Sequence, residues 1–134
     1  MSYSFKLWSH PEKLLKDHIS NVYKNGKLLY SKLKLDPKFE NLLDLCLLLH
    51  DIGKASTYFQ KYIHGIDQFS KGNIDETQLA ELKYQLGKRK NHARFSAIWT
   101  FIAAKQRLKN PVYSLIGFIT VLRHHGHFTN LEEM

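Results

Sequence analysis

The segment His50-Asp51-Ile52-Gly53-Lys54, which closes the apolar stretch NLLDLCLLL, constrains the fold more than any other feature. The apolar stretch predicts a buried helix, so an imidazole and a carboxylate come at the end of a helix inside the molecule. Neighbouring residues on an ideal helix point about 100° apart, and both can reach one site only where the helix frays, which the glycine permits. Imidazole binds divalent transition ions, and a carboxylate can bridge two of them. The pair therefore predicts a metal site and metal-dependent hydrolysis of a phosphoester.

Histidines elsewhere in the chain can complete such a site. His18 lies on the apolar face of an early predicted helix, His92 opens a later one, and His124 and His125 end the last one before Gly126. Each has an ordinary alternative: a core histidine, a helix cap, or a favourable interaction with a helix dipole. One shared site explains all four together, because a helical bundle assembles metal sites from side chains on facing helices.

Three other histidines, His10, His64 and His127, lack an apolar setting, and we expect them at the surface. Cys46 is the only cysteine and lies within LDLCLLL, so we expect a core residue rather than a nucleophile.

Helical periodicity dominates the chain, and strand alternation is nearly absent. Asp36-Pro37 and Asn110-Pro111 each combine a capping residue with a proline that suits the first helical turn. A surface loop is expected over 64–75. The predicted helices cover about residues 11–33, which Gly26 can divide in two, and then about 36–50, 54–65, 76–86, 91–108 and 111–125. The pattern predicts an all-α bundle of about five to seven helices with a metal site in its interior.

A chain of 134 residues, 43% of them hydrophobic, is expected to form one domain, residues 1–134. No stretch reaches the roughly 20 apolar residues that span a bilayer, so we expect no membrane partner. The first residues show no signal-peptide pattern, and a cytoplasmic protein is the simplest expectation.

The formal net charge of +8 favours an anionic partner, and nucleic acid is the first choice. The alternative is a lysine-rich surface without a function. Aromatic residues Tyr58, Phe59 and Tyr62 could stack on the bases of a single strand, although for Phe59 we favour core packing. The positive charge is concentrated just before and after His92, and the predicted nucleic-acid-binding residues are Lys88, Arg89, Lys90 and Arg94.

A longer pattern joins these residues. LLLHDIGKASTYFQKYI follows His18 and is itself followed by HARFSA at 92–97 and RHHGH at 123–127. These segments resemble the HD nuclease of type I CRISPR systems, within the HD superfamily of metal-dependent phosphohydrolases. The resemblance covers about residues 8–128. The lysine of HDIGK and the double histidine are more specific to this nuclease than the His-Asp pair alone.

The resemblance implies two divalent ions bridged by Asp51, with Lys54 contacting the scissile phosphate. The alternative for Lys54 is a solvated lysine in the first turn of a helix. A histidine-rich shell favours Mn, Ni, Co, Fe or Zn over Mg. The implied ligands of one ion are His18, His50, Asp51 and an aspartate from a later helix, and those of the other are Asp51, His92, His124 and His125.

The resemblance also implies the biological setting. The substrate would be single-stranded DNA, with RNA also open, cleaved in CRISPR antiviral defence. Because the chain has no GxxxxGK[ST] loop, strand separation must come from elsewhere. The implied partners are a helicase subunit and a crRNA-guided surveillance complex.

The sequence departs from the family pattern at one place. No aspartate follows Asp75, and Glu132 and Glu133 come too soon after the double histidine to replace the expected downstream ligand. We therefore expect a domain that is incomplete at its C-terminal end. Two other functions stay open: an HD phosphohydrolase acting on nucleotides, and a truncated, non-catalytic HD domain that binds nucleic acid or a partner.

Overall fold

The computed structural model describes residues 6–126, and these form an almost entirely helical structure. The elements are β1 (Trp8–His10), β2 (Lys13–Leu14), α1 (Leu15–Leu33), η2 (Pro37–Phe39), α2 (Glu40–Leu49), η3 (Ile52–Ala55), α3 (Thr57–Ser70), α4 (Glu76–Leu86), η4 (Gly87–Lys90), α5 (His92–Leu108) and α6 (Pro111–Leu122). The prediction of an all-α bundle with about five to seven helices is confirmed, since the described residues contain six α-helices.

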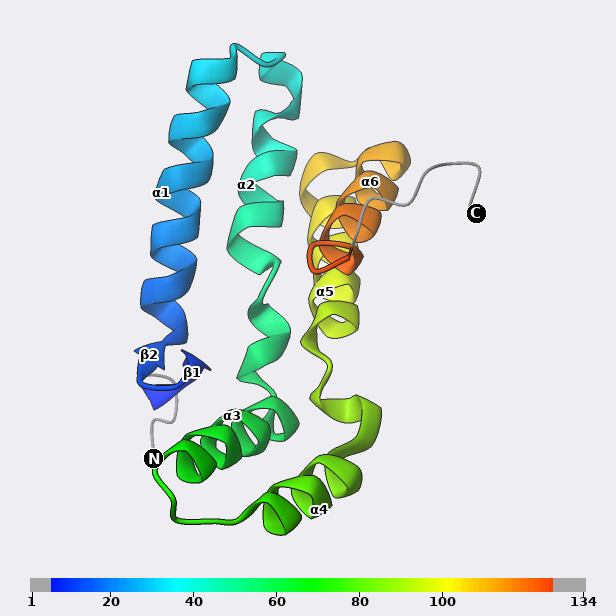
Figure 1. The fold of residues 1–134 in the computed structure, drawn as a ribbon. Coiled ribbons are helices and arrows are strands. Elements are labelled where there is room, and N and C mark those ends of the chain that lie inside the picture. The colour runs from blue at the N-terminus through cyan, green and yellow to red at the C-terminus, as the bar shows by residue number, and fades with distance from the viewer. Residues whose placement is uncertain (1–5, 127–134) are drawn as a thin grey trace, which may run out of the picture.

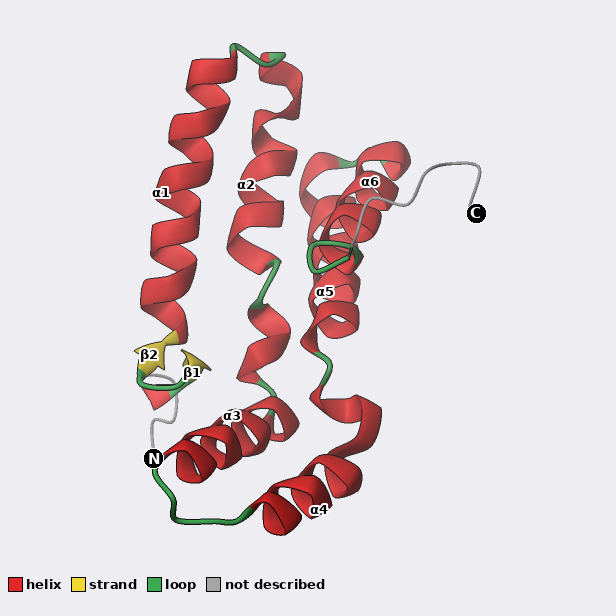
Figure 2. Cartoon of the chain, viewed as in Figure 1, coloured by secondary structure: helices red, strands yellow, loops and turns green. Residues whose placement is uncertain are grey.

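The helices form two pairs that stand side by side and a third pair that lies across one end (Figures 1 and 2). Helices α1 and α2 run antiparallel, and α5 and α6 form a second antiparallel pair beside α2. Helices α3 and α4 lie across the end at which α1 begins and α2 finishes. Within the described part of the chain, no helix is both long and apolar enough to cross a membrane.

A short hairpin precedes α1, where the sequence pattern predicted helix. Strands β1 and β2 pair antiparallel, and Pro11 and Glu12 form the turn between His10 and Lys13. Glu12 has a φ of 61°, which a helix cannot contain. Helix α1 therefore starts at Leu15, whose backbone N–H donates to the carbonyl of Leu7. The prediction of helix from residue 11 is wrong by four residues, because this turn interrupts it.

Gly26 does not divide α1, which runs unbroken from Leu15 to Leu33. A Cβ at Gly26 would lie only 2.6 Å from the side chain of Leu47 in α2. The glycine therefore allows α1 and α2 to approach closely. The predicted cap of the next helix is confirmed, because Asp36 accepts a hydrogen bond from the backbone N–H of Lys38.

Helix α3 continues through Gly65 to Ser70, so the surface loop predicted over 64–75 is correct only for its second part. Gly65 is buried, and a Cβ there would lie 2.2 Å from Leu82 of α4. The glycine serves the packing of α3 against α4 and does not end the helix. Asp75 and Gln78 form a capping box that starts α4 as the sequence predicted.

The main core lies where α2 meets α5 and α6. Its buried members are Leu42, Cys46, Ala97 and Val121. Cys46 is thus a core residue, as predicted, and burial raises the pKa of its thiol to about 11. This core holds the end of α2, the start of α5 and the end of α6 together, and these are the places where the sequence predicted metal-binding histidines.

Candidate metal centre

Asp51 lies at the centre of the predicted site, and its carboxylate is 2% exposed. Five imidazoles and one ammonium group surround this single carboxylate. Oδ1 lies 2.9 Å from His92 Nε2, 3.1 Å from His124 Nε2 and 4.0 Å from His125 Nε2. Oδ2 lies 2.8 Å from His18 Nε2, 3.5 Å from His50 Nε2 and 2.9 Å from Lys54 Nζ. The carboxylate therefore divides its surroundings into one group of residues for each oxygen.

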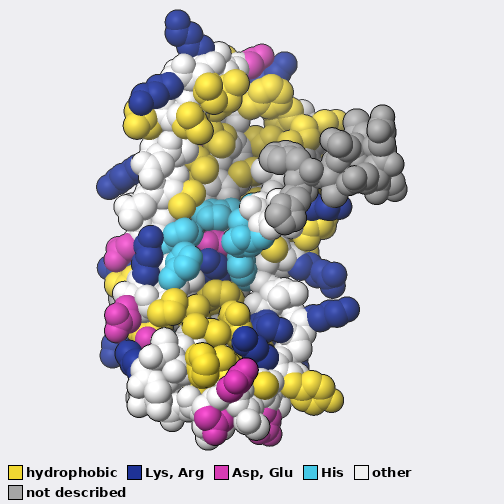
Figure 3. Space-filling model, in the orientation of Figure 1, with side chains coloured by type: hydrophobic (Ala, Val, Ile, Leu, Met, Phe, Trp, Pro, Cys, Tyr) yellow, Lys and Arg dark blue, Asp and Glu magenta, His cyan; other side chains and the backbone are white. Residues whose placement is uncertain are grey.

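Four parts of the fold deliver these side chains. His18 lies in α1, His50 caps the end of α2, and His92 is the first residue of α5. His124 and His125 follow α6 in the turn before Gly126. In Figure 3 the histidine side chains gather in the middle of one face, with hydrophobic side chains above and below them. The structure thus brings all six sequence-predicted metal ligands together.

Hydrogen bonds to the backbone fix the orientation of two of the rings. His50 Nδ1–H donates to the carbonyl of Leu47 over 2.8 Å, and His124 Nδ1–H donates to the carbonyl of Val121. A carbonyl can only accept, so the proton of each neutral ring is on Nδ1 and the Nε2 lone pair points toward Asp51. Metal-ligating histidines are commonly oriented in this way by a partner on the other ring nitrogen.

The charge of Asp51 dominates the electrostatics of the site. Burial by itself would raise the pKa of Asp51, but hydrogen bonds from His124, His92 and Lys54 hold this pKa well below its usual range. Burial lowers the pKa of His18 and of His50. Burial and the charges of His124 and His92 lower the pKa of His125 to about 4. These shifts favour an ionised carboxylate and neutral imidazoles, the forms that bind metal.

His124 differs from its neighbours. Burial acts to lower its pKa, but the hydrogen bond to Asp51 and the bond to the Val121 carbonyl raise the pKa above its usual value. The raised pKa reflects a proton shared between Nε2 and Asp51, and a metal ion bound at Nε2 would take the place of that proton.

The donor set fits divalent metal ions. The Nδ1–H bonds of His50 and His124 turn Nε2 of each ring toward the oxygens of Asp51, and a nitrogen and an oxygen placed in this way need a proton or a cation between them. The Nε2 atoms of His92 and His125 lie only 2.9 Å apart, which likewise requires a proton or a shared cation. Two groups can each offer ligand atoms that lie within 4.8 Å of one another: Asp51, His92, His124 and His125, and also His18, His50 and Asp51.

A family model described as Cas3, HD domain, matches residues 7–134. The chain belongs to the Cas3 HD-domain family. Searches of curated proteins and of solved structures gave no match. At the level of the family, this membership implies a CRISPR-associated, metal-dependent nuclease.

Lys54 of this Cas3 HD domain is not a solvated lysine. Lys54 is only 4% exposed, and its Nζ lies 2.9 Å from Asp51 Oδ2. The same Nζ lies over the ring of Phe59, 5.5 Å from the ring centre. The sequence alternative for Lys54 is therefore wrong, because η3 turns this side chain inward. Phe59 is itself 5% exposed, as expected for a core residue.

The predicted basic residues are sequence neighbours of His92, but none of them contacts Asp51 among the interactions of the described residues. Lys88, Arg89 and Arg94 are exposed, whereas Lys90 is half-buried and donates to the carbonyl of Gly87. The guanidinium of Arg89 lies 4.9 Å from the ring centre of Tyr58. Helix η4 carries most of this charge and leads directly into His92.

Two histidines that the sequence assigned to the surface, His10 and His64, are exposed, and each packs against another ring. The exposed His10 packs edge-on against His18, with ring centres 5.2 Å apart, and therefore borders the metal centre. The exposed His64 packs against Trp8. No spacing in the sequence pointed to His10, because its contact with His18 depends on the β1–β2 hairpin, which was not predicted. His127, Glu132 and Glu133 lie outside the described residues.

Proposed function

We propose that this Cas3 HD domain is a metal-dependent nuclease that hydrolyses phosphodiester bonds of single-stranded DNA, with RNA as a second substrate, in CRISPR defence. The observation that carries the proposal is the convergence of five imidazoles on the two oxygens of Asp51. Phosphodiesters react slowly without catalysis, and a pair of metal ions is a recurrent solution for cleaving them.

The proposed ligands of two ions follow the two oxygens of Asp51. His92, His124 and His125 face Oδ1, whereas His18 and His50 face Oδ2. When bound, divalent ions lower the pKa of water and neutralise charge on the phosphate. Asp51 would bridge them, since a carboxylate has two oxygens and an imidazole nitrogen has one lone pair. The imidazole-rich set favours Mn, Ni, Co, Fe or Zn over Mg.

Besides the metal ions, the proposed site has one positively charged side chain close to Asp51, that of Lys54. Its ammonium lies against Oδ2 of Asp51 in a buried setting, and we propose that it contacts the scissile phosphate. A charge held this rigidly by η3 can stabilise a phosphate oxygen without first being ordered, which is how preorganised groups favour a transition state.

The proposed substrate is supported by charge. The chain has a formal charge of +8, and Lys88, Arg89 and Arg94 are exposed beside the element that leads into His92. Arg89 and Tyr58 together present a cation and a ring, a combination that suits a flexible single strand. We further propose a helicase subunit and a crRNA-guided complex as partners and the cytoplasm as the location.

The test is to incubate the purified chain with excess Mn²⁺ and end-labelled single-stranded DNA, single-stranded RNA, duplex DNA and a nucleotide panel. We expect cleavage of single-stranded DNA, none in EDTA, and none by an Asp51→Ala variant. Hydrolysis of nucleotides alone would reassign the domain to the nucleotide phosphohydrolases. Activity that survives Asp51→Ala would refute any mechanism centred on this carboxylate.

A truncated, non-catalytic HD domain that binds nucleic acid or a partner is the second candidate. Within the described residues, the group around Oδ2 contains only three ligand residues and no second carboxylate. Elemental analysis after metal loading and gel filtration separates the two. Two ions per chain support the nuclease, and one ion per chain without cleavage supports the second candidate.

A further inference from the structure

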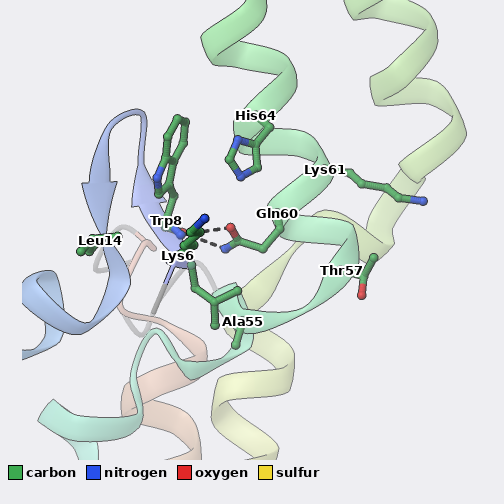
Figure 4. Close-up of a pocket in the computed structure, with 9 residues that line it drawn as sticks. Lys6, Trp8, Leu14, Ala55, Thr57, Gln60, Lys61 and His64 are labelled. Carbon is green, nitrogen blue, oxygen red and sulfur yellow. Dashed lines mark hydrogen bonds between the residues drawn. The ribbon is translucent and has the colours of Figure 1, made fainter. Parts of the chain in front are cut away.

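A cleft beside the metal centre has no role in the mechanism above. It is lined by Lys6, Leu7, Trp8, Leu14, Ala55, Thr57, Gln60, Lys61 and His64 and has a volume of about 920 Å³ (Figure 4). Such a volume lies within the range of small-molecule and nucleotide sites. The walls come from the β1–β2 hairpin, the two residues before it and the first half of α3, and Ala55 at the end of η3 forms part of the boundary.

Aromatic rings form one wall of this cleft. The rings of Trp8 and His64 pack with centres 4.2 Å apart and planes inclined by 33°. His64 is exposed, and Trp8 is half-buried. In Figure 4 both rings stand above the carboxamide of Gln60. Because the two rings pack on each other, the pair can offer a base only an outer face, and stacking on such a face tolerates any base.

The charge of the lining residues also points to nucleic acid. Lys6 and Lys61 are exposed cations at the edge of the cleft, and among residues 6–126 no acidic side chain lines it. A purely apolar peptide would find no use for these charges, whereas the phosphates on either side of a stacked base would pair with them. Aromatic and basic groups together are the usual composition of single-strand sites.

The cleft is tied rigidly to the metal centre. Gln60 Oε1 accepts from the backbone N–H of Trp8 over 3.0 Å, and its Nε2 donates to the carbonyl of Trp8 over 2.9 Å and to that of Lys54 over 2.7 Å. One carboxamide thus joins the tryptophan of the cleft to the lysine that contacts Asp51. The pairing of β1 with β2 is irregular between Trp8 and His10, where two residues of β1 pass one residue of β2. Trp8 packs against His64, Ser9 is buried, and His10 packs against His18.

We propose that the Trp8–His64 cleft binds an unpaired base of the nucleic-acid strand whose backbone reaches the metal centre. This assignment rests on the proposed nuclease function and adds a nucleotide subsite to it. A base stacked on Trp8 directs the adjoining phosphates past His10 and Lys54. The cleft is a binding and positioning site and contributes no group to the reaction itself.

The first test uses Trp8 as its own reporter. The chain has two tryptophans, and Trp99 on α5 is 57% exposed. A Trp99→Phe variant therefore leaves Trp8 as the only tryptophan. We expect its fluorescence to be quenched by a thymidine oligonucleotide in EDTA and not by an oligonucleotide of equal length made of abasic sites. Binding of the thymidine strand without quenching, or equal quenching by both, would overturn the proposal.

The second test measures affinity in EDTA by the anisotropy of a labelled strand. Trp8→Ala is expected to weaken binding about 5- to 150-fold, since base stacking on a ring contributes about 1–3 kcal/mol. Trp8→Phe should restore most of the affinity, and Trp99→Ala is the matched control that should leave it unchanged. Lys61→Ala should make the slope of log K against log salt concentration shallower by about 0.7. Lys32→Ala, in the last turn of α1 and away from the cleft, should leave this slope unchanged. A Trp8→Ala variant that binds like the control would also overturn the proposal.

Cleavage kinetics separate this proposal from the function on which it rests. With Mn²⁺, Trp8→Ala should raise KM by the same factor as Kd and leave kcat within about twofold, which a general loss of structure would not do. If the wild-type chain cleaves DNA but Trp8 does not respond to it, the cleft assignment alone fails. If Trp8 responds in EDTA but no metal supports cleavage, the nuclease assignment fails and the cleft stands as a binding site.

Discussion

The backbone N–H of Gly53 donates to Oγ of Ser96 over 2.9 Å, in a fully buried contact between residues 43 positions apart. Gly53 lies in η3, directly after the His50-Asp51 pair, and Ser96 lies one turn into α5, after His92. A Cβ at Gly53 would lie 2.3 Å from the carbonyl oxygen of His92. The contact therefore places the carboxylate of Asp51 beside the imidazole of His92.

Replacing Ser96 with alanine should destabilise the protein by about 1–3 kcal/mol, because the buried N–H of Gly53 loses its acceptor. Urea unfolding in EDTA measures the change. Ser114→Ala is the matched control: its hydroxyl is also buried but only donates to the Asn110 carbonyl, which already accepts from the Ser114 N–H. An effect of Ser114→Ala as large as that of Ser96→Ala would contradict this account.

Gly53→Ala should be more damaging, because the new methyl group overlaps the backbone of His92 and cannot be accommodated by a side-chain rotation. We expect a loss of about 1–3 kcal/mol in stability and at least a tenfold loss in Mn²⁺ affinity, since His92 and Asp51 must separate. Calorimetric titration with Mn²⁺ checks the affinity. Gly72→Ala introduces strain at a φ of 74° but meets nothing within 4 Å, so it should lower stability without changing metal affinity.

Much of this arrangement could be predicted from the sequence because the signals are local. The apolar helix before His50, the caps at Asp36 and Asn110, and the double histidine behind an apolar helix each act within a few residues. The candidate metal ligands could be selected because one shared site explains together four histidines that would otherwise each need a separate role.

The parts that could not be predicted depend on distant contacts. Gly26 and Gly65 look like helix breakers in the sequence, but each is required where another helix approaches. The place of His10 depends on a two-residue turn and the strand pairing that follows it. Trp8 and His64 meet only after β1 is joined to α3 by Gln60, and no spacing along the chain announces that contact.

The Cys46 thiol should make stability fall at high pH. Burial raises its pKa from 9.0 to about 11, so the folded state favours the neutral thiol. The resulting stabilisation is complete below pH 9 and is lost as the pH rises from 9 through about 11. We expect wild type to lose about 2 kcal/mol more than Cys46→Ala between pH 8 and pH 10.5. Urea unfolding of both proteins at the two pH values tests this, and equal losses would show that the thiol is not shielded.

Metal binding should stabilise the fold by an amount that grows with the logarithm of the free ion concentration above Kd. At a free Mn²⁺ concentration 100 times Kd, the gain is about 2.7 kcal/mol and raises Tm by several degrees. His92→Ala should remove most of this gain, because it takes a ligand from the group around Oδ1. His64→Ala, a histidine outside both groups, should retain the full gain. A metal-dependent rise in Tm that is the same in both variants would place the ion elsewhere.

The Asp51–Lys54 pair should respond unequally to the loss of either partner. Lys54 is buried with one carboxylate partner among the described residues, whereas Asp51 also receives hydrogen bonds from histidines. Asp51→Ala in EDTA should therefore cost about 3–5 kcal/mol, because it leaves a buried ammonium unpaired, and Lys54→Met should cost less than half as much. Adding Lys54→Met to Asp51→Ala should then recover stability, although no activity.

Urea unfolding of the four proteins gives the coupling energy between the two side chains. We expect a strongly non-additive cycle, with the double variant at least as stable as Asp51→Ala alone. Asp44→Ala, which removes a partner of the solvent-accessible Lys27, is the control and should have a far smaller effect. If the Asp51 and Lys54 losses were simply additive, the two groups would not be paired in the folded protein, and Lys54 could not be held beside the metal centre by this carboxylate.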